Sequence, residues 1–127
     1  MRKVVITREK VKLVGRLLRY KCLLNVNYDE FMQFILEGAD EWKDDWVAIR
    51  RRFLLGHPTQ VAGVNNGSTI EVEISEEENT LFVVALTSSG LSVSNEQIIE
   101  ASGSDKSYSI KTNYDWKKGT ELTLCED

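Results

Sequence analysis

The only histidine in the chain, His57, is the residue through which a Ser/His/Asp or Cys/His catalytic set would have to work. It lies between Gly56 and Pro58, a sequence that is typical of the end of a helix. No G-x-S-x-G motif, H-x-x-x-H motif or glycine-rich phosphate loop occurs in the sequence. We therefore interpret His57 as a surface or capping residue, and we predict that the protein is not an enzyme.

A cluster of acidic residues could bind a hard cation through its carboxylate oxygens. On a helix its members would be neighbours four residues apart, where like charges repel. The spacing does not match a calcium-binding loop, so we interpret the cluster as a solvated face or as an acidic surface for a partner. The sequence therefore predicts neither a metal site nor a cofactor. The members of the cluster are Asp40, Glu41, Asp44 and Asp45.

Three consecutive arginines, Arg50, Arg51 and Arg52, are the strongest indication of an anionic ligand. The net charge of the chain is −4, however, so there is no general attraction to nucleic acid. Binding of nucleic acid or another anionic ligand through a basic patch is therefore the alternative function. Basic residues nearer the N-terminus could enlarge that patch: Lys10, Lys12, Arg16, Arg19 and Lys21.

Tryptophans could instead contact a protein partner, because large aromatic side chains are common anchors of protein interfaces. Trp42 and Trp46 lie on one stripe of a predicted helix, and Trp116 precedes a turn. The preferred function is thus a non-enzymatic protein-binding or regulatory module, and a homodimer and a different protein partner both remain open. The candidate contact residues are Trp42, Trp46, Arg50, Arg51, Arg52 and Trp116.

Two strands are expected before residue 27, because the apolar residues there alternate. Val4, Val5 and Ile6 indicate the first strand, and "LLRYKCLLNV" indicates the second. Leu23 interrupts the polar face of the second strand, so we expect that face to be partly covered. The apolar face of this strand consists of Leu18, Tyr20, Cys22, Leu24 and Val26.

A helical segment is expected from about residue 28 to about residue 55, because the apolar spacing changes to three and four residues. Asn27 followed by Glu30 resembles a capping box with Asn as the cap. One helix kinked near Gly38 and two helices meeting there both fit the pattern. The apolar stripe consists of Phe31, Ile35, Ala39, Trp42, Trp46, Ile49 and Phe53.

The remainder of the chain predicts short strands separated by turns, which is typical of a sandwich or a small barrel. Asn65-Asn66-Gly67 predicts a tight hairpin turn with positive φ angles. In "TIEVEI", at residues 69–74, the apolar and acidic residues fall on opposite faces. "TLFVVALT", at residues 80–87, is apolar on both faces, so we expect it to be a central strand.

These patterns predict a single domain over residues 1–127 of mainly β class. We expect an antiparallel β-sandwich with an inserted amphipathic helical segment, about residues 28–55, that lies across a sheet face or an open end of the core. The alternative is an α+β fold with the helix packed on one antiparallel sheet. The segments Val4–Val26 and Val61–Leu86 together resemble the small β-sandwich domains of uncharacterised bacterial proteins. That resemblance implies a recognition module and supplies no catalytic residues.

Cys22 and Cys125, the only cysteines, form no CxxC pair. We expect two free thiols in a reducing compartment, although a disulfide that ties the second strand to the last one is not excluded by the sequence. No apolar run reaches the ~20 residues of a membrane span. We therefore expect a soluble, cytoplasmic protein.

Overall fold

The structure is a computed structural model that describes residues 1–11, 20–37, 60–87, 90–115, 117 and 119–127. Within these ranges the chain forms nine strands and one helix. The predicted helical segment therefore has a described part, helix α1, and a part outside the described residues. In chain order the elements are β1 (Arg2–Arg8), β2 (Tyr20–Leu24), α1 (Tyr28–Glu37), β3 (Gln60–Val64), β4 (Thr69–Ile74), β5 (Asn79–Thr87), β6 (Gly90–Val93), β7 (Gln97–Ile99), β8 (Lys106–Asp115) and β9 (Gly119–Glu126).

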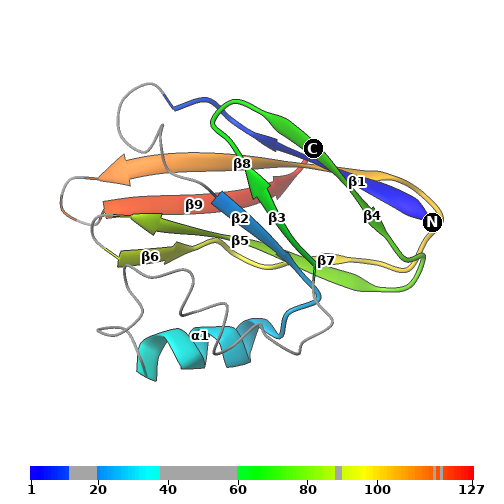
Figure 1. The fold of residues 1–127 in the computed structure, drawn as a ribbon. Coiled ribbons are helices and arrows are strands. Elements are labelled where there is room, and N and C mark those ends of the chain that lie inside the picture. The colour runs from blue at the N-terminus through cyan, green and yellow to red at the C-terminus, as the bar shows by residue number, and fades with distance from the viewer. Residues whose placement is uncertain (12–19, 38–59, 88–89, 116, 118) are drawn as a thin grey trace.

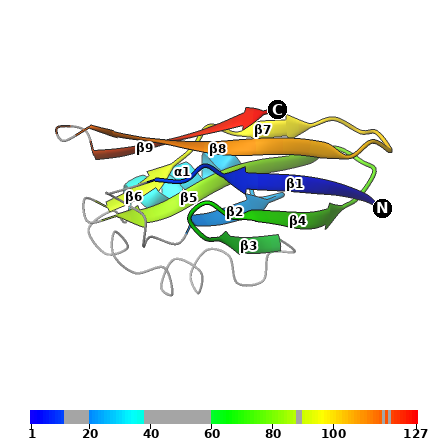
Figure 2. The same cartoon turned by 90° about the horizontal axis from the view of Figure 1, so that it is seen from above.

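Two sheets face each other, as Figure 1 and Figure 2 show. Sheet A has the strand order β4-β1-β8-β9, and sheet B has the order β3-β2-β5-β6, with β7 also paired to β5. The pairing of β1 with β8 is parallel, and the other described pairings are antiparallel. This arrangement confirms the predicted mainly β, sandwich-like fold, with one parallel pair that the sequence pattern did not indicate.

Strand β5 connects the two apolar layers of the molecule. Its residues Leu81 and Val83 lie in the core between the sheets, whereas Phe82 and Val84 lie in a second cluster against α1. All four are completely buried, and each such side chain contributes about 1.5–3 kcal/mol relative to an exposed one. The prediction that "TLFVVALT" forms a central strand with two apolar faces is therefore confirmed.

Helix α1 covers the face of sheet B that points away from sheet A (Figure 1). The Asn27 side chain accepts a hydrogen bond from the Glu30 amide at 3.0 Å, which confirms Asn27 as the N-cap. Phe31 is completely buried, and the centre of its ring lies 5.3 Å from the centre of the Phe82 ring. Leu23 is buried in the same cluster, so the expectation that the second face of β2 is covered is confirmed as well.

The prediction that Val26 continues the apolar face of β2 is wrong. Val26 packs with Leu23 and Phe31 under the helix, whereas Cys22 and Leu24 face the other sheet. The reason is Asn25, whose φ of 59° lies in the left-handed region and breaks the alternation of the strand. Asparagine tolerates this conformation better than most residues because its short side chain can form local hydrogen bonds.

The turn at Asn65–Gly67 forms, but it does not join two paired strands. Ser68 donates its amide to the oxygen of Asn65 at 3.1 Å, and Gly67 has the expected positive φ of 71°. However, β3 before the turn pairs with β2 in sheet B, and β4 after it pairs with β1 in sheet A. The predicted hairpin is therefore a crossing between the two layers. Tight-turn chemistry specifies the reversal of the chain but not the partner of each strand.

The two cysteines are free thiols on different sheets. Cys22 is buried in the core between the sheets. Cys125 lies between the inward-facing Leu124 and the exposed Glu126, so its half-buried side chain points toward the outer face of sheet A. The disulfide that the sequence left open is therefore absent.

Strand β1 carries a buried charge at one end of the sandwich. Arg2 is 2% exposed, and its guanidinium donates hydrogen bonds to four main-chain oxygens. These belong to Ser75, Glu77, Glu100 and Ser104, at 3.0, 2.9, 2.7 and 3.5 Å respectively. Because these carbonyls replace the water that the cation loses, Arg2 ties the β4–β5 turn to the segment after β7.

Candidate functional site

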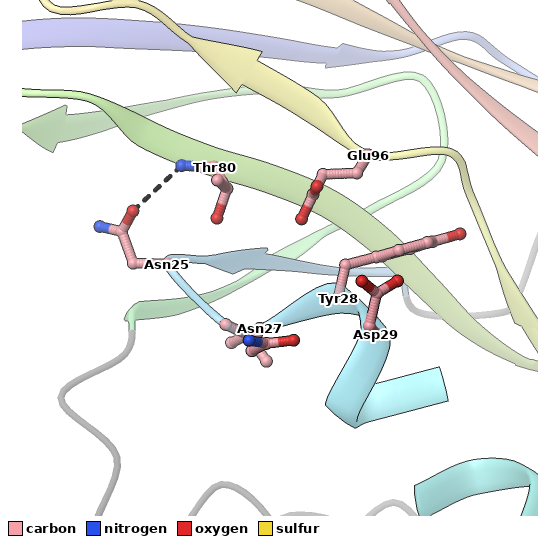
Figure 3. A pocket seen from close by; sticks show the side chains of 7 residues that line it. Asn25, Asn27, Tyr28, Asp29, Thr80 and Glu96 are labelled. Carbon is pink, nitrogen blue, oxygen red and sulfur yellow. Dashed lines mark hydrogen bonds between the residues drawn. The ribbon is translucent and has the colours of Figure 1, made fainter. Parts of the chain in front are cut away.

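The six predicted contact residues lie outside the described residues. The same holds for His57 and for the acidic cluster between residues 40 and 45. These predictions stay predictions. The described residues do form a pocket beside the first turn of α1 (Figure 3). The predicted contact residues are Trp42, Trp46, Arg50, Arg51, Arg52 and Trp116.

The pocket has a volume of about 420 Å³ and is open to solvent. Three segments that are distant in the sequence form it: the connection from β2 into α1, the start of β5, and the connection between β6 and β7. The described residues that line it are mostly polar and include no lysine or arginine. The residues that line it are Asn25, Val26, Asn27, Tyr28, Asp29, Thr80 and Glu96.

Asn25 holds the wall of the pocket that adjoins β5. Its side-chain oxygen accepts a hydrogen bond from the Thr80 amide at 3.0 Å (Figure 3), and its side-chain nitrogen donates to Asn79 at 2.9 Å. Its own amide donates to the oxygen of Thr80, also at 3.0 Å. This ring of hydrogen bonds fixes the direction in which the chain leaves β2, and therefore the place where α1 begins.

Tyr28 forms the inner side of the pocket. Its hydroxyl donates to the main-chain oxygen of Ser94 at 2.8 Å, and its ring lies edge-on to Phe82 with 5.0 Å between the ring centres. Burial and the negative charges of Glu96 and Asp29 raise the pKa of the Tyr28 hydroxyl. Tyr28 is therefore a fixed, protonated side chain that positions the helix against the sheet.

A break in the strand beside β5 brings Glu96 into the pocket. β6 pairs with residues 84–87 of β5 and β7 with residues 79–81, so the two behave as one strand interrupted at Ser94–Glu96. At the break the Ser94 hydroxyl accepts the amide of Val83 at 2.8 Å. The residues between the two pairings bulge outward, which is a common way for a strand to redirect a side chain toward a site.

Two carboxylates from different elements meet in this pocket. Asp29 belongs to the first turn of α1, and Glu96 to the break between β6 and β7 (Figure 3). Burial and, second, the negative charge of Asp29 raise the pKa of Glu96. Within the described ranges, neither carboxylate has a basic side chain or a hydrogen-bond donor as a partner. The described part of the chain therefore places two acids in the pocket and no counter-charge beside them.

The helix terminus adds nothing that would favour an anion. The Asn27 cap already takes up the amide of Glu30, and acidic side chains occupy the first turn. A ligand that suits this pocket is a cation that can also donate hydrogen bonds, such as an ammonium or a guanidinium group. No group of three or more potential metal ligands occurs among the residues that the structure describes.

Sequence reasoning did not identify this pocket. The capping signal at Asn27 places Asp29 in the first turn of a helix, so the position of Asp29 could be predicted from the sequence. Glu96 had no local signal, because its role depends on the break at Ser94 and on the pairing of both flanking segments with β5.

In comparisons with known proteins, no family model, no curated protein and no solved structure matches the chain. The resemblance to small bacterial β-sandwich domains therefore stays a prediction from the strand pattern. In the part of the chain that the structure describes, no helix is both long enough and apolar enough to cross a bilayer.

Proposed function

We propose that this chain is a non-enzymatic protein-binding module whose pocket beside α1 takes up a basic side chain of a protein partner. The observation that supports this proposal is the meeting of Asp29 and Glu96, with no basic side chain beside them among the residues that the structure describes. A lysine or arginine placed between them would relieve their mutual repulsion and would form charge-assisted hydrogen bonds. The open, shallow shape suits a side chain presented by a surface.

The pocket offers little for catalysis. Tyr28 is held by its bond to Ser94, and a nucleophile paired with a base is not present among the lining residues. The alternative function, binding of an anionic ligand, depends on Arg50–Arg52 and is tested by a shift assay at low and moderate salt. Loss of all association on raising the salt would favour it.

The proposal is tested by titrating the ¹⁵N-labelled protein with N-acetyl-arginine amide and, in parallel, with the neutral N-acetyl-glutamine amide. We expect the arginine compound alone to shift the amide signals of Tyr28, Asp29 and Glu96. The double variant Asp29→Asn, Glu96→Gln should lose this response. The variant Glu76→Gln, Glu78→Gln, which removes the same charge from an exposed turn, should retain it.

A selection from displayed random peptides extends the test to proteins. Peptides enriched on the natural chain, but not on the Asp29→Asn, Glu96→Gln variant, should contain arginine or lysine. Equal response to both small probes, or enrichment of peptides without basic residues, would contradict the proposed function.

A further inference from the structure

The second edge of strand β4 is a row of main-chain groups that no described strand covers. β4 pairs with β1 on one side and is the last strand of sheet A on the other. The amide of Arg8 donates to the oxygen of Ser68, which is the next pair of the same ladder. In an antiparallel ladder every second residue bonds to the partner strand, so the even-numbered residues of β4 bond to β1.

The odd-numbered residues of β4 therefore direct their main-chain N–H and C=O groups toward the open edge. These residues are Thr69, Glu71 and Glu73, and all three side chains are exposed on the outer face of sheet A. Glu71 forms a long ion pair of 3.8 Å with Lys3, in which both side chains are more than half exposed. A strand added here would find hydrogen-bonding groups and two carboxylates in a regular row.

The other edge of the same sheet is closed in a different way. The side chain of Asn95 accepts the amide of Leu124 at 2.9 Å and donates to its oxygen at 3.0 Å, as a neighbouring strand would. Gln97 donates to the same oxygen, and Ser92 donates to the oxygen of Thr120. Side chains thus bond to outward-facing main-chain groups of β9. On β4, by contrast, the edge is accompanied by the exposed acidic side chains of Glu71 and Glu73.

The acidic row disfavours a second copy of this chain as the occupant. An antiparallel β4–β4 pairing would place carboxylates of Glu71 and Glu73 opposite one another, and like charges directly opposite across two strands are destabilising. An incoming strand with basic residues at alternate positions would place opposite charges at the same distance. Charge complementarity therefore selects the partner.

We propose that the open edge of β4 accepts an extended basic segment of a protein partner as an additional antiparallel strand, with lysine or arginine opposite Glu71 and Glu73. Main-chain hydrogen bonds would supply most of the affinity, and the two carboxylates would select the sequence. This surface lies on sheet A, away from the pocket beside α1, so it is a second and independent contact.

The test uses the fluorescent peptide acetyl-Thr-Lys-Val-Lys-Val-Thr-amide and two N-methylated forms of it. Lysines opposite Glu71 and Glu73 must point their N–H groups at β4, whereas the valines point theirs away. Methylation of the main-chain nitrogens of the two lysines should therefore weaken binding by about tenfold or more, because two main-chain hydrogen bonds to β4 are lost. Methylation of the valine nitrogens should change binding by less than about threefold. Fluorescence anisotropy measures all three affinities.

Protein variants test the role of charge. The double variant Glu71→Gln, Glu73→Gln should weaken the peptide severalfold, whereas Glu76→Gln, Glu78→Gln, with the same loss of charge on the adjacent turn, should not. The pocket variant Asp29→Asn, Glu96→Gln should bind the peptide normally, which separates this proposal from the proposed function of the pocket.

Hydrogen exchange of the β4 amides shows directly whether the edge is open in the free protein. In the free protein the amides of Glu71 and Glu73 should exchange fast and that of Val72 slowly, and the peptide should protect the first two. Protection of Glu71 and Glu73 without peptide would show that the chain covers its own edge and would overturn the proposal. Absence of binding would overturn it too. Equal binding of both methylated peptides would do the same, because the edge would then be acting only through its charge.

Discussion

The guanidinium carbon of Arg8 lies 3.5 Å from the centre of the Tyr20 ring, in the interior between the two sheets. Both side chains are completely buried. Arg8 also donates to the main-chain oxygen of Val64 at 3.1 Å, and the Tyr20 hydroxyl lies 2.8 Å from the hydroxyl of Thr112. An aromatic face and a main-chain carbonyl thus help to hold a cation in the core.

Replacement of Arg8 by lysine should destabilise the protein more than replacement by methionine. Lysine keeps a charge to be buried but has no planar guanidinium to stack on Tyr20, whereas methionine removes the charge and fills similar space. We expect Arg8→Lys to lower the free energy of unfolding by about 2–4 kcal/mol. Urea denaturation measures both variants, and a lysine variant as stable as the natural chain would contradict the assigned role.

Replacement of Asn25 should separate backbone strain from hydrogen bonding. Asn25→Ala loses the bonds to Thr80 and Asn79 and must hold a positive φ, so we expect a loss of about 2–3 kcal/mol. Asn25→Gly loses the same bonds without the strain and should be about 1 kcal/mol more stable than the alanine variant. Equal unfolding midpoints for the two variants would show that the left-handed conformation costs nothing.

Cys22 should be chemically silent in the folded protein. Burial raises the pKa of its thiol to about 12, so almost no thiolate is present at neutral pH. With a chromogenic disulfide reagent at pH 8, we expect one thiol per chain, that of the half-buried Cys125, to react rapidly. The second should react only after unfolding in urea, and Cys125→Ser should abolish the rapid phase. Fast reaction of two thiols would be incompatible with this core.

Glu96 should make the protein slightly less stable at neutral than at acidic pH. Its pKa is raised in the folded state, so its ionisation disfavours folding. The penalty is absent below the pKa of the unfolded chain and complete above the pKa of the folded one. Glu96→Gln should therefore raise the free energy of unfolding at pH 7, by about 0.5 kcal/mol or less because the side chain is half-exposed, and leave it unchanged at pH 3.

The same titration checks the contact between the two acids. Asp29→Asn removes the second cause of the shift, so the pKa of Glu96, followed by NMR of its side-chain carboxyl carbon, should fall toward its ordinary value without reaching it. A pKa that does not change would mean that Asp29 and Glu96 do not interact, and the proposed cation pocket would lose its basis.

Local patterns predicted much of the fold. The alternation in β4, the two apolar faces of β5 and the cap at Asn27 each depend on neighbouring residues, and each is found as expected. The pairing of β3 and β4 with different sheets depends on residues far away along the chain, and the turn between them has the same chemistry in either case.

Buried arginines are the clearest example of what the pattern concealed. Arg2 and Arg8 lie on the same face of the strand as Val4 and Ile6, so the alternation predicts that their side chains point inward. Their charge favours exposure, and carbonyls of distant loops and the ring of Tyr20 help to make burial tolerable. The pocket is similar, because Glu96 acquires its position from a break in a strand rather than from its own neighbours.

The parallel pairing of β1 with β8 has a consequence for how the protein is made. Lys3 and Asp105, which are joined by a hydrogen bond in this region, are 102 positions apart in the sequence. During synthesis β1 is made before β8, so it cannot pair with β8 until the residues between the two strands have been synthesised. Contacts of such long range slow folding, because loop closure precedes any gain from the contact. Until then Arg2 and Arg8 flank the apolar residues of β1 with positive charge, and in the folded protein both are buried at the two ends of that strand.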